Sequence, residues 1–273
     1  MSEFHPDLAA YFTRIGYVGP RDVSLATLHG ILGAHTAAIP FENLDVLLGR
    51  PINLEPAAIE EKLVRRRRGG YCFEQNTLLL HVLTSLGFSV TPLSGRVRLQ
   101  QPRDFTPPRT HLFLRVDLGN EPWLADAGIG ALSLTSSIRL DREGEQPTAH
   151  EPRRIVREDG RWFHQARLGD DWTDVYEFTG EVMPAIDREL ANWWTSASPK
   201  SKFRQMLSIG RAGPAGTRFV IRNNEFIHRR GAEALQRCEI TTPEQLLELL
   251  AGHFGLHFPA DTRFGAPGSP WPN

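Results

Sequence analysis

The chain has 273 residues, of which 40% are hydrophobic and 23% charged, values that disfavour extensive disorder, collagen and coiled coil. Its 31 lysines and arginines nearly balance its 32 aspartates and glutamates, so the net charge of −1 gives no reason to expect a nucleic acid or an anionic membrane as partner. The N-terminus, MSEFHPDLAA, lacks the pattern of a secretory signal, and the longest apolar stretch, near 78–83, is far too short to span a membrane. Two cysteines are too few for a disulfide framework. We therefore expect a cytoplasmic protein, and its length suggests about two domains.

Hydrophobic periodicity changes twice along the chain. Apolar residues at three- and four-residue spacing predict helices at 6–16, 24–38, 56–68 and 72–87. From about residue 88 the period becomes two, which predicts strands at FSVTPLSGRVRL, HLFLRVDL, PWLADAG, RIVRE, RWFHQARL and WTDVYEF, with a hairpin turn at Asp159-Gly160. After Gly180 the pattern is mixed, with helices at 184–198 and 243–254, a hairpin around Asn223-Asn224 and a coil at 263–273. These patterns predict a multidomain α+β fold: a helical section (1–87), an antiparallel sandwich or barrel (88–182) and a smaller α/β section (183–273).

Cys72, in RRRRGGYCFEQN, has the surroundings of a reactive thiol. Gly69-Gly70 ends one helix, and the next helix is predicted to begin near Cys72, where unpaired N–H groups and the helix dipole favour a thiolate. The helical spacing from Cys72 through Asn76 and Leu79 turns the sulfur inward. The alternative is an inert buried cysteine. The arginines at 65–68 complement the negative end of the preceding helix, or else form a phosphate-binding patch.

A thiolate nucleophile needs a base, and His111 has a geometric argument in its favour. If Gly119-Asn120 is a two-residue hairpin turn, paired residue numbers sum to 239, so His111 and Asp126 become diagonal neighbours on one face. Their side chains would then be placed for a carboxylate–imidazole hydrogen bond. A shift of one residue would put them on opposite faces, so this prediction depends on the turn.

Other chemistries find little support in the sequence. Cys238 is expected to lie in the core of a strand. The two cysteines are far apart, and no CxxC, HxxxH or HExxH spacing indicates a metal site. Neither a Walker A loop nor a dinucleotide-binding fingerprint is present.

Several ordered motifs resemble those of the arylamine N-acetyltransferase family across nearly the whole chain. They are PFENLDV at 40–46, RGGYCFEQN at 68–76, THLFLRV at 110–116, DAGIG at 126–130 and SPKSKF at 198–203. The resemblance implies Cys72 as acyl-accepting nucleophile, His111 as its base and Asp126 as the residue that orients the histidine, in a papain- or transglutaminase-like arrangement. It also implies a helical bundle, a β-barrel and an α/β lid, matching the three sections above.

The resemblance further implies the substrates and their sites. Acetyl-CoA is the expected cosubstrate, with no permanently bound cofactor, and small arylamines, hydrazines or N-hydroxyarylamines are the expected acceptors of a monomer or homodimer. Phe41, Val97, Ile129 and Phe203 are the expected acceptor-pocket residues. Ile129 replaces an aromatic residue of the usual D-V-G-F-G motif, so we expect a differently shaped pocket. The expected CoA-binding residues are Ser94, Gly95, Arg96, Gly128 and Gly130, with the segment 128–131, Lys200 and Lys202 as further phosphate contacts.

The expected reaction has two steps. The Cys72 thiolate, paired with protonated His111, attacks the thioester, and N–H groups at the helix start hold the developing oxyanion. The amine then attacks the acetyl-cysteine in the second half of a ping-pong cycle. Two alternatives remain: a cysteine hydrolase or transglutaminase-like enzyme acting on amides with the same triad, and a non-catalytic binding module.

Overall fold

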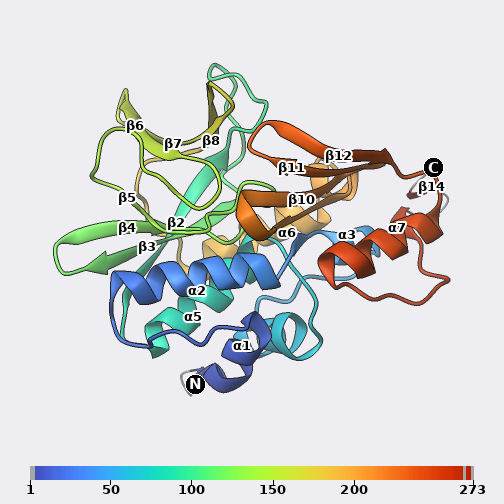
Figure 1. Cartoon of the computed structure of the whole chain (residues 1–273), viewed down its shortest axis with the longest axis horizontal. Helices are drawn as coiled ribbons and strands as arrows, with labels where there is room; N and C mark the ends of the chain where they lie inside the picture. The colour runs from blue at the N-terminus through green and yellow to red at the C-terminus, as the bar shows by residue number, and fades with distance from the viewer. Residues whose placement is uncertain (1–3, 267–268, 272–273) are drawn as a thin grey trace.

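The computed structural model describes residues 4–266 and 269–271, and its N-terminal helices pack beneath an antiparallel sheet (Figure 1). The helical segments there are α1 (Leu8–Ile15), α2 (Leu25–Ala38), α3 (Leu44–Leu47), α4 (Pro56–Glu60) and α5 (Cys72–Ser85). Helix α4 continues into a π-helical turn, Glu61–Arg65, and Arg67 then adopts a left-handed backbone conformation (φ 53°) that ends the helix. Helix α5 contacts strands of the sheet and carries fully buried leucines on its inward face, as the periodicity predicts. The helices predicted in the first 87 residues are therefore present.

A seven-stranded antiparallel sheet follows, in the order β5-β4-β3-β2-β8-β7-β6. Its strands are β2 (Ser89–Val97), β3 (His111–Leu118), β4 (Glu121–Ala125), β5 (Ile138–Arg139), β6 (Arg153–Glu158), β7 (Arg161–Leu168) and β8 (Asp171–Phe178). Asp159 and Gly160 both have positive φ (51° and 72°) between β6 and β7, as a two-residue hairpin turn requires. The large hydrophobic core lies between this sheet and the helices.

A second, five-stranded sheet has the order β1-β9-β10-β11-β12. Four of its strands come from the C-terminal section: β9 (Ser208–Ala212), β10 (Thr217–Arg222), β11 (Glu225–Arg230) and β12 (Glu233–Glu239). The fifth, β1 (Phe41–Glu42), comes from the N-terminal third and pairs with β9. The sheet packs with α3 and α7 (Pro243–Leu249), which ends in a π-helical turn at Leu250–Phe254, while α6 (Ala185–Ala197) precedes it. An N-terminal segment is thus built into the C-terminal sheet.

The C-terminal segment corrects one expectation. Residues 263–273 are expected as coil, yet β13 (Phe264–Ala266) pairs with β14 (Ser269–Trp271); 267–268 and 272–273 lie outside the described residues. Phe264 is buried against Phe258 in the second core, and this anchor holds the strand in place despite the proline and glycine nearby. Cys238 lies in β12, partly buried on the same core, close to its expected place. No helix in the described part of the chain has the length and apolarity needed to cross a membrane.

Candidate active site

Helix α5 begins at Cys72, as the glycine pair predicts. The Glu74 carboxylate reaches back to accept a hydrogen bond from the Tyr71 N–H at 3.1 Å, so it caps the helix start. A Cβ at Gly70 would lie 2.7 Å from that carboxylate, which explains why glycine precedes Tyr71. The Cys72 thiol is 4% exposed and donates to the Thr110 carbonyl oxygen at 3.6 Å. Cys72 is the first residue of α5, so its thiol lies at the positive end of the helix dipole, where a helix start leaves N–H groups without partners in the helix.

The imidazole of His111 and the carboxylate of Asp126 come from the hairpin of β3 and β4. The observed pairs run from Leu118↔Glu121 to Leu114↔Ala125, so residue numbers sum to 239 as predicted. His111 starts β3 and Asp126 follows β4, and His111 Nε2 donates to Asp126 Oδ2 at 2.8 Å. Both side chains are buried. The predicted register therefore brings the imidazole and the carboxylate together.

Asn76 holds this carboxylate from the opposite side. Its Nδ2 donates to Asp126 Oδ1 at 2.9 Å and to the Leu112 carbonyl at 2.6 Å, while its Oδ1 accepts from the Ala127 N–H at 2.9 Å. Asp126 Oδ1 also accepts from the Gly128 N–H at 2.8 Å. The helix that carries Cys72 is thus fastened to the turn that carries Asp126. Sequence reasoning gave Asn76 no role, although its position one helical turn after Cys72 was a usable signal.

The charge of His111 follows from these contacts. Complete burial alone would lower the pKa of the imidazole, but the Asp126 carboxylate and the nearby Cys72 raise it to about 10. Because Nε2 donates to Asp126, Nδ1 is the nitrogen left for exchange with the thiol. The arrangement can therefore hold a proton on His111 beside a nucleophilic sulfur at neutral pH.

The arginines at 65–68 are engaged in ion pairs. Arg65 pairs with Asp7, Arg66 with Glu61, and Arg68 with Glu42 at 2.7 Å. Three of the four cations therefore already have carboxylate partners. This favours the interpretation that the arginines stabilise the end of the preceding helix over the interpretation that they bind phosphate. Arg68 also ties the glycine-rich segment to β1 through Glu42.

Two of the four expected acceptor-pocket residues lie in an aromatic cluster with Cys72. Phe41 and Phe203 have ring centroids 5.9 Å apart, and Phe203 is 5.8 Å from Tyr71. Tyr71, Phe73, Leu112 and Met183 belong to the same small cluster. Ile129 and Val97 pack instead with the larger core between helices and sheet. Tyr71 and Met183 are members of this cluster that the sequence analysis did not single out.

The residues expected to bind CoA lie in different surroundings in the structure. Ser94 lies in a cleft of about 510 Å³ with Arg109, Thr110 and residues of α6. Gly95 pairs with His111, and Arg96 donates to the Pro107 carbonyl at 2.6 Å. Lys200 and Lys202 are exposed.

The glycines after β4 serve close packing. A Cβ at Gly128 would lie 2.5 Å from Cys72 Cα, and its N–H is already given to Asp126. Gly130 has a positive φ of 77° and lies under the Phe41 ring. Both glycines therefore allow the turn after β4 to approach Cys72 and Phe41 closely. Among the described residues, no group of three His, Cys, Asp or Glu side chains is placed to hold a metal ion.

Several known proteins are similar to this chain in sequence and in structure. The N-acetyltransferase family model matches residues 24–263. An arylamine N-acetyltransferase / N-hydroxyarylamine O-acetyltransferase from Salmonella typhimurium is 41% identical over 91% of this chain and 88% of its own length, and an Escherichia coli arylamine N-acetyltransferase is 39% identical over 92% and 89%. The solved Salmonella typhimurium structure superposes with a TM-score of 0.88 over 97% of each chain, at 37% identity. The Mycobacterium marinum enzyme in complex with CoA gives 0.87 over 91% and 92%, at 35% identity.

Proposed function

Because this chain belongs to the arylamine N-acetyltransferase family, we propose that Cys72, His111 and Asp126 carry out its transfer of an acetyl group from acetyl-CoA to arylamines. The observation that carries the proposal is the hydrogen-bonded His111–Asp126 pair beside a thiol at a helix start. Asp126 orients the imidazole and stabilises its protonated form. Asn76 keeps that carboxylate in place.

In the first half-reaction, the Cys72 thiolate attacks the thioester carbonyl of acetyl-CoA while His111 carries the proton. The unpaired N–H groups at the start of α5 stabilise the tetrahedral oxyanion. The C–S bond to CoA then breaks, and His111 Nδ1 gives its proton to the departing CoA sulfur. The acetyl group remains on Cys72 as a thioester, and His111 is neutral.

In the second half-reaction, the nitrogen of an arylamine attacks the acetyl-cysteine carbonyl. An arylamine suits this step because, unlike an alkylamine, it is mostly unprotonated near neutral pH. Neutral His111 accepts the proton that the nitrogen loses, and the Cys72 thiolate leaves beside the imidazolium. This restores the starting ion pair. Hydrazines and N-hydroxyarylamines are further acceptors in this proposal.

The aromatic cluster supports the position of the acceptor. Phe41, Phe203 and Tyr71 offer ring faces and edges to a flat substrate beside the sulfur. The cleft lined by Ser94, Arg109 and Thr110 offers a route for acetyl-CoA, because the Thr110 carbonyl already contacts the thiol. We also propose a division into residues 1–87, 88–182 and 183–273, with the nucleophile on the first part and the base and its carboxylate on the second. It is supported by the seven-stranded sheet, whose strands all lie between residues 89 and 178.

Intact-protein mass spectrometry tests the mechanism. With acetyl-CoA alone, the enzyme should gain one acetyl group on Cys72 and release one equivalent of CoA before any amine is added. An arylamine should then remove the acetyl group. The Cys72→Ala variant is the matched control and should gain no mass. An enzyme that hydrolyses amides but never becomes acetylated would instead support the cysteine hydrolase alternative, and a fully active Cys72→Ala variant would overturn the assignment of the nucleophile.

A further inference from the structure

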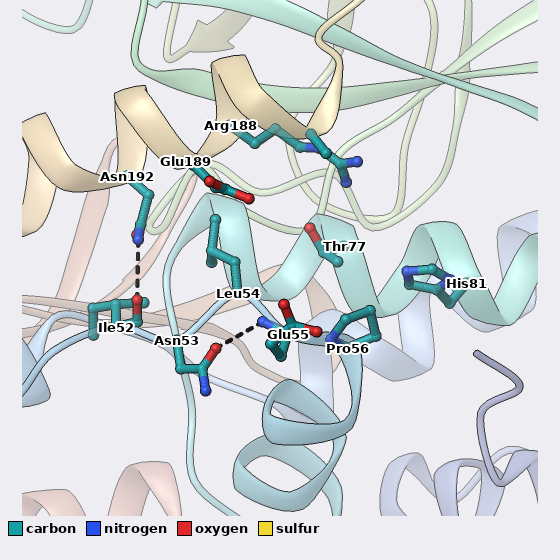
Figure 2. Close-up of a pocket in the computed structure, with 11 residues that line it drawn as sticks. Ile52, Asn53, Leu54, Glu55, Pro56, Thr77, His81, Arg188, Glu189 and Asn192 are labelled. Atoms are coloured by element: carbon teal, nitrogen blue, oxygen red, sulfur yellow. Dashed lines mark hydrogen bonds between the residues drawn. The ribbon is translucent and has the colours of Figure 1, made fainter. Parts of the chain in front are cut away.

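A second cavity lies between helix α6, helix α5 and the segment at residues 52–56 (Figure 2). Its volume of about 500 Å³ falls in the range of small-molecule sites. Cys72 and His111 are not among the residues that line it. The acetyl-transfer reaction described above leaves this cavity without a role.

Thr77 of α5 contributes a polar side chain to the lining of the cavity. The residue is 3% exposed, and its hydroxyl oxygen has no hydrogen-bond partner among the described residues. Figure 2 shows this hydroxyl turned toward the space beneath α6. A buried hydroxyl without a partner is costly, so it points to a ligand or a water that supplies one.

Arg188 of α6 supplies a cation at the same cavity. Its Nε is buried and has no hydrogen-bond partner in the described part of the chain. Burial lowers the pKa of the guanidinium although Glu189 opposes this, which indicates that no protein anion fully compensates the charge. A planar guanidinium whose Nε has no partner suits a carboxylate.

Two carboxylates and an apolar wall also line the cavity, together with the polar side chains of Asn53, His81 and Asn192. Glu189 of α6 and Glu55 of the facing segment enter from opposite sides (Figure 2). Between them stand the apolar side chains that line the cavity: Ile52, Leu54, Pro56 and Ala185. The cavity therefore offers a cation, two anions and an apolar surface within a small volume.

We propose that this cavity binds a small zwitterion, an α-amino acid with an apolar side chain. Its carboxylate pairs with Arg188 and accepts a hydrogen bond from Thr77. Its ammonium group lies between Glu55 and Glu189, and its side chain packs on Leu54 and Pro56. An anion alone would meet two carboxylates, and a cation alone would meet Arg188, so only a ligand with both charges matches the lining.

The cavity is also connected to the nucleophile helix. Asn192, which lines it, donates to the Ile52 carbonyl at 3.1 Å and accepts a hydrogen bond from the Tyr71 hydroxyl. Tyr71 is the residue that precedes Cys72 at the helix start. A bound amino acid would therefore touch a group that is one hydrogen bond away from the active site.

Isothermal titration with L-leucine as the probe tests the proposal. Wild-type protein should bind one equivalent saturably, while leucinamide, which lacks the carboxylate, and 4-methylpentanoate, which lacks the amine, should bind at least about tenfold more weakly. Equal binding of 4-methylpentanoate would contradict a zwitterion site. A wild-type titration with no saturable heat would overturn the proposal altogether.

Substitutions of the lining residues test whether leucine binds in this cavity. Arg188→Gln and the double change Glu55→Gln with Glu189→Gln should each weaken leucine binding at least about tenfold, since each removes one half of the charge match. Thr77→Val, which keeps the shape of the side chain, should weaken binding less and leave folding intact. Arg142→Gln, at an exposed position away from the cavity, is the matched control and should bind like wild type. Cys72→Ala should also bind normally, so a failure of the catalytic proposal would not affect this result, whereas unchanged binding in Arg188→Gln would exclude the cavity as the site.

Discussion

Two buried clusters of charged side chains differ in how their hydrogen bonds are arranged. Around Asp126, both carboxylate oxygens accept hydrogen bonds, from His111, Asn76 and the Gly128 N–H. Around Glu151, three arginines, Arg153, Arg218 and Arg229, surround one carboxylate. Nitrogens of Arg153 and Arg218 there have no hydrogen-bond partner within the described residues.

The difference separates a cluster suited to proton transfer from one suited to holding two sheets together. Burial alone would raise the pKa of Glu151, but Arg218 and the other arginines hold it far below its usual range, so its charge is fixed. These groups come from β6, β10 and β11, and so they join the seven-stranded sheet to the five-stranded one. The Asp126 cluster instead contains His111, whose proton can move to or from a neighbour. Four experiments test whether the two clusters differ in this way.

The largest expected effect is on catalysis. Asp126→Asn keeps the shape of the side chain but cannot stabilise the imidazolium, so we expect the rate of acetyl transfer to fall by about 10⁴. The measurement is single-turnover acetylation by acetyl-CoA, with circular dichroism to verify the fold. A variant that keeps near-wild-type acetylation would show that Asp126 does not orient His111.

Glu151→Gln should act on folding. It leaves three arginines, two of them fully buried, without their counter-charge, so we expect the free energy of unfolding to fall by about 3–5 kcal/mol. Urea denaturation measures the loss, and acetylation per folded molecule should stay close to wild type. A variant of unchanged stability but low activity would reverse the roles assigned to the two clusters.

Gly128→Ala tests the close approach of the Asp126 turn to helix α5. The added Cβ would lie 2.5 Å from Cys72 Cα, so helix α5 or the turn must move, at a cost of about 1–3 kcal/mol in stability. We expect the rate of acetylation to fall as well, because the thiol and His111 separate. Gly119→Ala is a useful control, since the space around that Cβ is open and only its positive φ of 59° disfavours alanine; loss of activity there would argue against a local effect at Gly128.

The change that should accumulate most gradually, over several pH units, is a pH dependence of stability. The pKa of His111 is raised from 6.5 to about 10 in the folded protein. Its stabilising contribution is therefore complete below pH 6.5 and is lost as the pH rises from there toward 10, with a slope of at most about 1.4 kcal/mol per pH unit. Urea denaturation of wild type and His111→Gln across this window measures the difference, and parallel curves would contradict a raised pKa.

The sequence was most informative where one local rule fixed the geometry. Gly69-Gly70 placed the start of α5 at Cys72, and the Gly119-Asn120 turn set the register that joins His111 to Asp126. Contacts between distant segments could not be predicted this way. The two-residue strand Phe41–Glu42 has no period to detect, and its partner β9 lies more than 160 residues later. The Glu151 cluster is similar, since its arginines look like ordinary solvated charges in the sequence.

Phe41 contacts distant parts of the chain through both its backbone and its ring. It pairs with Gly210 of β9 and forms a bridge with Gly70, just before helix α5. Its ring meanwhile stands over Gly130 and against Phe203. If the protein were produced as two separate fragments, 1–182 and 183–273, Phe41 of the first fragment would have to pair again with β9 of the second. Recovery of acetyl transfer on mixing the fragments would then show that this interface had formed.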